Sequence, residues 1–370
     1  MRGRLPRPPE LRIGEGRASG PLSVTLGALS VLAVLCFRFP DLLTTPDLRA
    51  AYPLDLLRAV LFGALLLTLG LGGMSVVLAP RPRLGSLGIA LAGVAIALGG
   101  AWVETGELRG RAHTLGLDWF VLNLLVLAVV FVPLERAFAL SPDQRVLRDG
   151  FRTDLTWFLF SHLLVQGIVY LTMTPARVFF GWAVSPGLQA AVSGLPLAMQ
   201  VPLAVGVADL FQYGIHRLFH RVPWLWRFHA IHHSSRELDW LAGSRLHLVD
   251  VVVTRATSFL PLFLLGFSET AVLVYVVFVS FQAVWIHANL RTRFPRLGRF
   301  LMTPEYHHWH HTAEPEARDR NFAVHLPVLD ALFGTCWRAD RWPTRYGIEG
   351  EAVPEGWLAQ LAHPFGRTGG

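Results

Sequence analysis

The sequence predicts an all-α fold, a polytopic membrane helical bundle, from two observations. The first is composition: 52% of the 370 residues are hydrophobic and only 16% are charged, with a mean hydropathy of +0.43. A chain of this length and apolarity is neither an ordinary soluble domain nor a single membrane anchor. The second is that the apolar residues gather in runs close to the ~20 residues that a helix needs to cross a bilayer.

The basic residues are all arginine, and the formal net charge is +7. They lie between the apolar runs rather than in one patch, as in the cytoplasmic loops of membrane proteins, so we expect no nucleic-acid partner. The absence of lysine indicates a genomic bias that favours a bacterial source, and we expect the protein in the bacterial inner membrane. Two cysteines, Cys36 and Cys336, are too few for a disulfide framework or a cysteine metal site.

The N-terminal part divides into a tail and a helical region. Residues 1–20 are rich in arginine and are expected to form a basic cytoplasmic tail. Residues 21–140 are expected to hold the N-terminal transmembrane helices. The first apolar run lacks a cleavage pattern before Arg38, so we expect a retained span rather than a removed signal peptide. The runs in this region are 22–37, 54–79, 84–102 and 117–134.

Two pairs of small residues in the run 84–102 predict close helix packing. Small residues four positions apart lie on one helix face and let a neighbouring backbone approach. The pairs are Gly88 with Ala92 and Gly93 with Ala97.

Apolar runs continue at 155–174, 188–211 and 256–287, the last interrupted at Pro261 and Gly266. Arginines stand at both ends of this last run, so both ends should lie on one side of the membrane, which predicts a helical hairpin. Counting crossings from a cytoplasmic tail places the loops 80–84, 135–154 and 216–255 in the cytoplasm. We expect a histidine-rich, metal-binding cap there, followed by a C-terminal tail at 341–370.

Most of the 15 histidines lie between His216 and His311. Residues three or four apart share one helix face, so each cluster can converge on a point. Helix surfaces rarely need imidazoles for structure, so the pattern predicts a metal centre; a pH-sensing patch and an adventitious surface site are the alternatives. At least nine imidazoles are too many for one ion and suit two. Imidazole binds zinc, copper, iron and nickel alike, so the residues alone do not select the metal.

The histidines form an ordered set of motifs with short further motifs between them. The motifs are His216-x-x-x-His220, His229-x-x-His232-His233, His287-Ala-Asn289 and His307-x-x-His310-His311, with Arg245-x-His247 and Thr303-Pro304 between them. This ordered set resembles the fatty acid hydroxylase and sterol desaturase superfamily of integral-membrane di-iron oxygenases. The similarity covers about residues 150 to 340, where we expect the catalytic domain. The sequence departs from the family at Ala323, where glycine is usual.

The resemblance implies two iron ions, with zinc as a substitute in a purified sample. It also implies a reaction that uses O2 and two electrons to hydroxylate or desaturate an unactivated C–H bond of a sterol, fatty acyl, sphingolipid or isoprenoid substrate. No catalytic residue is expected beyond the metal centre. Asp209, Asn289 and Asp330 are expected to orient the ligand rings. The ligands implied are His216, His220, His229, His232, His233, His287, His307, His310 and His311, with His247 as a tenth ligand or a donor to one.

Two other functions remain open from the residues. One is a zinc-dependent membrane hydrolase or isomerase, although no glutamate lies within the histidine motifs; the other is a membrane metal transporter, although its ligands should lie near the bilayer midplane. An oxygenase would need an external electron donor, a ferredoxin, cytochrome or flavoprotein reductase, because the chain has no redox-cofactor motif of its own. Exposed arginines could steer an acidic donor; equally, they could fix topology and bind anionic lipid.

Overall fold

The computed structural model describes residues 19–51, 53–78, 82–109, 114–163, 178–350 and 353–366. Most of the basic tail, residues 80–81 of the 80–84 loop and the second half of the run 155–174 therefore lie outside the described residues. The described part is helical, with two isolated β-bridges and no named strand. Six of its helices are long and apolar enough to cross a membrane. The prediction of an all-α, integral-membrane bundle is confirmed.

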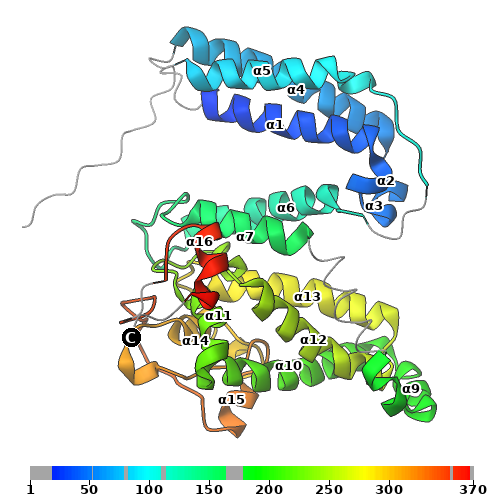
Figure 1. Ribbon diagram of the computed structural model, residues 1–370. Helices are drawn as coiled ribbons and strands as arrows, with labels where there is room; N and C mark the ends of the chain where they lie inside the picture. The colour runs from blue at the N-terminus through cyan, green and yellow to red at the C-terminus, as the bar shows by residue number, and fades with distance from the viewer. Residues whose placement is uncertain are drawn as a thin grey trace, which may run out of the picture. The chain divides into compact units, whose positions relative to one another are not determined.

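The chain divides into two compact units, residues 1–121 and 122–370. In the first unit, three long helices pack against one another (Figure 1). They follow the predicted apolar runs, because predominantly apolar segments of 15 to 25 residues favour helix in lipid. The elements are α1 (Ser19–Arg38), α2 (Pro40–Leu43), α3 (Pro46–Ala51), α4 (Leu54–Leu78), α5 (Arg83–Ala97) and η1 (Gly100–Trp102).

Small residues hold the three long helices close together. The Ser23 hydroxyl of α1 donates a hydrogen bond to the Thr68 carbonyl of α4, at 2.8 Å. A Cβ added at Gly88 of α5 would lie 2.0 Å from the Ser23 oxygen, so α1 and α5 require glycine there. Gly88 and Ala92 are buried, as predicted. The second predicted pair is wrong: Gly93 and Ala97 are exposed, and nothing lies within 4 Å of a Cβ at Gly93.

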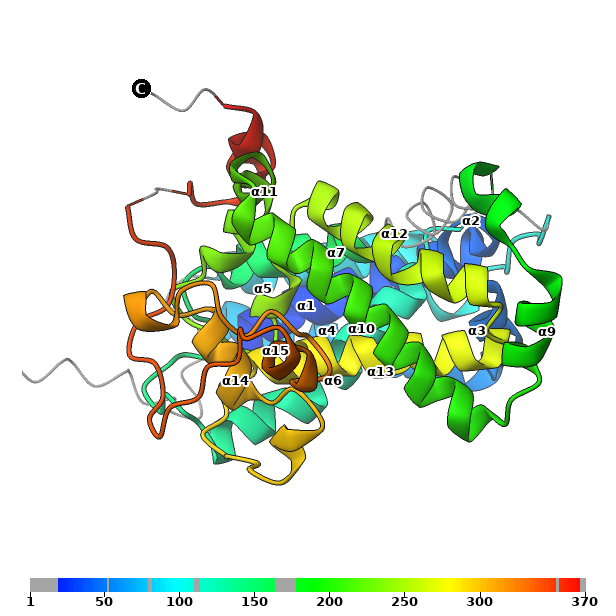
Figure 2. The ribbon, with the colours of Figure 1, turned by 90° about the horizontal axis from the view of Figure 1, so that it is seen from below.

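In the second unit, α10 packs against both α12 and α13, and the views in Figures 1 and 2 agree on this arrangement. Shorter helices gather around one end of the three. The helix α6 begins in the first unit and continues here. The elements are α6 (Leu117–Ala137), α7 (Phe151–Leu163), α9 (Pro186–Ser193), α10 (Leu197–Arg221), α11 (Pro223–His233), η3 (Ala242–Ser244), α12 (Leu248–Leu265), α13 (Glu269–His287), α14 (Pro304–His310), α15 (Val328–Leu332) and α16 (Trp357–Ala362), with short 3-10 turns at 181–183, 297–299, 315–317 and 363–365.

The hairpin predicted within 256–287 is formed by α12 and α13. Gly266 adopts a left-handed conformation, with φ of +73°, and ends α12. Ser268 then caps α13 by accepting a hydrogen bond from the Ala271 N–H. Gln189 of α9 donates to the Phe263 carbonyl at 3.0 Å and so fastens α9 to this turn.

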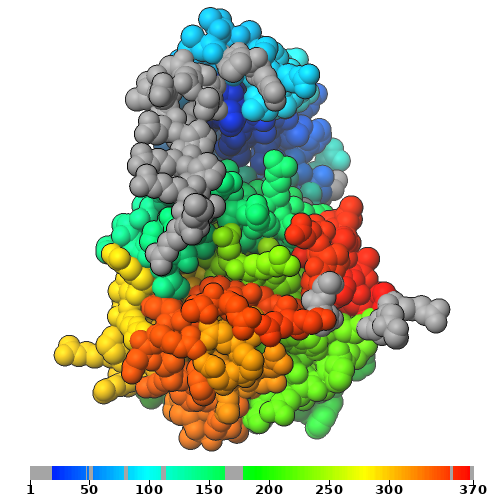
Figure 3. Space-filling view, turned by 90° about the vertical axis from the view of Figure 1, so that its left-hand side faces the viewer, coloured from blue at the N-terminus to red at the C-terminus, as the bar shows by residue number. Residues whose placement is uncertain are grey.

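The run 188–211 differs from the single span expected. The chain breaks between α9 and α10, where Gly194 and Pro196 favour a turn over continued helix. The second helix, α10, then runs past the apolar residues to Arg221 and carries the first histidine pair. After α13 the chain is mostly loops and short helices, which cover the face of the second unit that Figure 3 shows in orange and red.

Candidate metal centre

Four helices bring the histidines together. The last turns of α10 carry His216 and His220. After the sharp turn at Val222–Pro223, α11 carries the second cluster, which is His229, His232 and His233. The C-terminal residue of α13 is His287. The short helix α14 begins after Thr303 with proline in its first turn, where a missing N–H costs nothing. It presents the third cluster, which is His307, His308, His310 and, directly after the helix, His311.

The rings form two groups, each with its candidate ligand atoms within 4.8 Å of one another. We call them the five-histidine group and the four-histidine group. All nine rings are buried; the His220 residue as a whole is half-buried, but its side chain is only 5% exposed. The five-histidine group is His216, His220, His229, His233 and His310; the four-histidine group is His232, His287, His307 and His311.

Hydrogen bonds fix the proton on one nitrogen of six of these rings. In each case Nδ1 faces an oxygen that can only accept, a carbonyl or a carboxylate, so Nδ1 carries the hydrogen and Nε2 keeps its lone pair. Three of the rings donate at 2.6 to 2.7 Å. The pairs are His216 with the Phe322 carbonyl, His220 with Asp319, His229 with Asp250, His232 with the Arg245 carbonyl, His287 with the Ala283 carbonyl and His310 with the Arg320 carbonyl.

The lone pairs then face one another. His216 Nε2 and His229 Nε2 lie 3.0 Å apart, and His287 Nε2 lies 3.3 Å from His232 Nε2. With both hydrogens on the far side of the rings, such contacts are repulsive unless a cation lies between them. Nitrogens that each lie about 2.1 Å from one metal ion are roughly 3.0 to 3.4 Å apart. The donor set therefore fits two metal ions, one in each group.

The rings are also held neutral. Burial, reinforced by neighbouring imidazoles, lowers the pKa of His216 to about 3. The same causes lower the pKa of most of the other rings outside the membrane helices well below the usual value of 6.5: His220, His232, His233, His307, His310 and His311. Neutral imidazole is the form that binds metal.

His247 joins neither group, in contrast to the prediction of a tenth ligand. It is the residue before α12, and its Nδ1 accepts a hydrogen bond from the Val249 N–H at 3.1 Å. Its Nε2 lies 3.2 Å from the Leu361 carbonyl. His247 is therefore a helix cap through Nδ1, and its Nε2 is engaged by the Leu361 carbonyl. His308 of the third cluster also stays outside, between Tyr346 and the Ala288 carbonyl.

The resemblance predicts that Asp209, Asn289 and Asp330 orient the ligand rings. The structure instead gives these side chains other hydrogen-bond partners. Asp209 accepts from three successive backbone N–H groups at 324–326, and Asn289 pairs with both backbone groups of Ser141. Asp330 acts at one remove, because it holds the Phe322 N–H, and the Phe322 carbonyl accepts from His216. These side chains order the backbone around the site.

The carboxylates that do contact ligands are Asp250 and Asp319. The sequence interpretation missed both. Asp250 stands in the first turn of an otherwise apolar helix, which is a signal that could have found it. Asp319 begins the sequence Asp319-Arg320-Asn321-Phe322, which directly precedes Ala323. The glycine usual at 323 is not required by backbone conformation here, because positive φ occurs at Asp319 and Asn321 instead.

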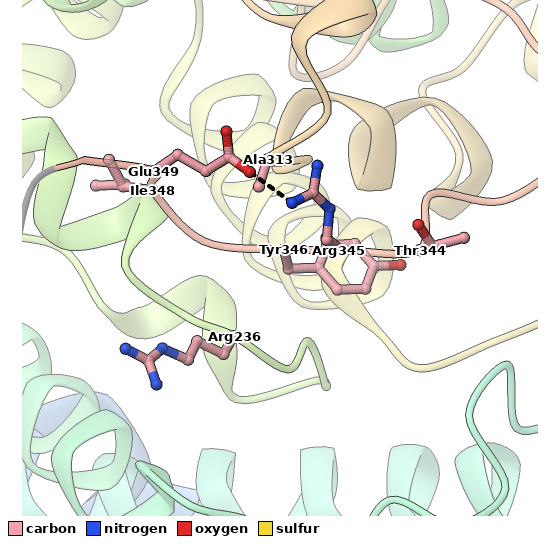
Figure 4. Close-up of a pocket in the computed structure, with 7 residues that line it drawn as sticks. All are labelled: Arg236, Ala313, Thr344, Arg345, Tyr346, Ile348 and Glu349. Atoms are coloured by element: carbon pink, nitrogen blue, oxygen red, sulfur yellow. Dashed lines mark hydrogen bonds and ion pairs between the residues drawn. The ribbon is translucent and has the colours of Figure 1, made fainter.

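An open surface pocket of about 350 Å³ contains no histidine of either group. Figure 4 shows the Arg345–Glu349 ion pair on one side and Arg236 on the other. The pocket borders the site only indirectly, because the Tyr346 hydroxyl hydrogen bonds to His308. The histidine groups are instead enclosed by protein.

Comparison with known proteins agrees with this geometry. The family model described as fatty acid hydroxylase matches residues 201–335. Ornithine lipid hydroxylase OlsE of Rhizobium tropici is 37% identical over 175 residues, which are 47% of this chain and 53% of that protein. Human alkylglycerol monooxygenase is 29% identical over 38% of this chain and 31% of its own length, and fatty acid hydroxylase vlmA of a Lecanicillium species is 32% identical over 40% and 44%.

The matched part of this chain thus covers about half, or less, of the length of these relatives. No solved structure matches. All nine grouped histidines fall inside the matched residues, as do the carboxylates Asp250 and Asp319. The chain therefore contains a region, residues 201–335, that matches the fatty acid hydroxylase family.

Proposed function

We propose that this protein is a membrane-bound di-iron oxygenase that uses O2 and two electrons to hydroxylate a C–H bond of a lipid. The observation that carries the proposal is the meeting of nine buried imidazoles in two adjoining groups, with the proton of six placed on the nitrogen away from the centre. The five-histidine group would hold one ion and the four-histidine group the other. The oxygenase and hydroxylase names of the relatives support iron over zinc.

When bound, the iron pair would supply O2 activation and one-electron chemistry. The chain's own residues keep most of the rings neutral, hold six of the nine by the Nδ1–H, and exclude bulk water by burial. No carboxylate belongs to either group among the described residues, so the ions would keep a high positive charge. Positioning one C–H bond beside them is then the remaining task of the protein.

A lipid substrate fits the apolar helices that lead to the site. The hairpin helices α12 and α13 end beside it: Asp250 near the start of α12 holds His229, and His287 ends α13. A chain lying along these helices would reach the ions from the bilayer. The relatives are named as hydroxylases or monooxygenases of ornithine lipids, alkylglycerols and fatty acids, which supports an acyl or alkyl chain as the substrate.

The electrons would come from a separate protein, and the site would face the cytoplasm of a bacterial inner membrane. The arginine distribution supports this side. Exposed arginines beside the histidine helices offer a cationic surface to an acidic ferredoxin, cytochrome or flavoprotein. They include Arg221, Arg291, Arg296 and Arg299.

Expression in a bacterial host, with mass spectrometry of the lipid extract, tests the function. We expect a lipid that gains one oxygen atom, with O2 supplying it, and loss of that product in His232→Ala. His308→Gln is the matched control, because His308 lies in the third cluster but in neither group. A lipid that loses two hydrogens instead would indicate desaturation. An unchanged lipid profile, or full turnover by His232→Ala, would contradict the proposal.

A further inference from the structure

The segment Asp239–Arg245 lies directly against two rings of the four-histidine group. His232 Nδ1–H donates to the backbone carbonyl of Arg245 at 3.1 Å. A Cβ added at Gly243 would lie 2.8 Å from His287 Nδ1, so the segment touches that ring as well. Any displacement of this segment would therefore move two of the four rings.

Four buried charged side chains fasten this segment to the rest of the second unit. Arg148 bridges two carboxylates, with Nη2 2.6 Å from Asp154 and 2.7 Å from Asp239. The Arg245 guanidinium pairs with the other oxygen of Asp154. The four side chains are only 0 to 7% exposed, and two positive charges balance two negative ones. We call Arg148, Asp154, Asp239 and Arg245 the arginine–aspartate quartet.

The quartet also sets the backbone of the segment. Asp239 Oδ1 accepts hydrogen bonds from the Leu241 and Ala242 N–H groups, at 3.1 and 2.9 Å, and so starts the turn that presents Gly243. Arg245 links the quartet directly to the metal site, because its side chain belongs to the quartet and its backbone carbonyl accepts the hydrogen bond from His232. A buried ion pair of this kind costs desolvation, and losing one partner leaves an uncompensated charge.

Half of the quartet comes from outside the domain that the family model matches. Arg148 and Asp154 precede residue 201. Between them, Gly150 has φ of +84°, and a Cβ there would lie 2.5 Å from Arg245 Nη2. Both the backbone conformation and the approach of Arg245 therefore require glycine at this position. The local sequence is shaped to receive Arg245.

We propose that the arginine–aspartate quartet positions the four-histidine group, so that Arg148 and Asp154 are positioning residues for one of the two metal sites. The inference rests on the proposed function in that the histidines bind metal. It adds that the two sites are supported separately. The five-histidine group has its own support, because Asp250 holds His229 and the Phe322 carbonyl holds His216.

Cobalt titration of the metal-free full-length protein in detergent tests this positioning role. Cobalt absorption should develop in two phases, one for each histidine group. The variant His232→Ala should remove the phase of the four-histidine group, and His229→Ala should remove the phase of the five-histidine group. We expect Asp154→Asn to weaken the His232 phase 10- to 100-fold, the usual effect of losing support behind a metal ligand, and to change the other phase less than about threefold. Arg148→Lys, which keeps the charge but cannot bridge two carboxylates as well, should shift the same phase.

Glu349→Gln is the matched control, because it removes a carboxylate from the exposed Arg345 pair and should change neither phase. Equal weakening of both phases by Asp154→Asn and Arg148→Lys would mean that the quartet serves only general stability, and would overturn the inference. Two unchanged phases would overturn it as well, while leaving the metal centre standing. A wild-type protein that binds no cobalt would overturn the proposed function and the inference together.

Discussion

Replacing Asp250 by alanine should weaken metal binding by the five-histidine group. The Asp250 carboxylate accepts the His229 Nδ1–H at 2.7 Å, and the two side chains are only 4% and 5% exposed. In the variant, water has little access to that N–H, and an unpaired buried donor costs about 1–3 kcal/mol. The negative charge that strengthens His229 as a ligand is lost as well. Together these effects should lower the affinity about 10- to 100-fold, or roughly 1.4–2.7 kcal/mol.

Competition with a chelator of known affinity measures this change on the purified protein. Thr254→Val is the control, because the Thr254 hydroxyl donates to the other oxygen of Asp250 at 3.1 Å and does not touch His229. Thr254→Val should bind metal with an affinity within about threefold of wild type. If Asp250→Ala also stayed within that range, the orientation of His229 by Asp250 would be refuted.

Three further outcomes are expected. The folded metal-free protein should lose stability as the pH falls from about 6.5 toward 3, because the pKa values of the buried histidines are lowered and the unfolded chain therefore binds protons first. Thermal unfolding at pH 7.5 and 5.0 measures this loss, and an unchanged midpoint would contradict it. Chelation of the metal should lower the thermal midpoint, because lone pairs at 3.0 Å would lose the cation between them, and restored metal should reverse the loss; no shift would argue against bound metal. Gly88→Val should destabilise the first unit by about 1–3 kcal/mol through its clash with Ser23, whereas Gly93→Val, which faces open space, should be nearly neutral in the same unfolding assay; equal effects would refute the packing argument.

The sequence was sufficient to find eight of the nine grouped histidines because their spacing is local, whereas His287 stands alone in the sequence and was assigned only through the family resemblance. Residues three or four apart on a helix face must point the same way, whatever lies around them. The pattern could not assign His247, because a polar residue just before an apolar helix is equally suited to capping, and the structure uses it so. Only the local hydrogen bond to Val249 distinguishes the two roles.

Contacts between residues that are far apart in the sequence could not be predicted from it. Asp319 is 99 residues from His220, and Asp154 is 91 residues from Arg245. No periodicity connects such positions. The break before α10 is different, because Gly194 and Pro196 are local turn signals within the apolar run 188–211. Gly93 shows the converse limit, because a small residue permits close packing but does not determine which helix face receives a neighbour.

The central claim is that the two histidine groups hold one metal ion each. Its most direct measurement is the metal content per chain of protein purified with iron present, for wild type and for His232→Ala. The account predicts about two iron ions in the wild type and about one in the variant, because His232 belongs only to the four-histidine group. A wild type that holds one ion or none, or a variant that retains two, would contradict it.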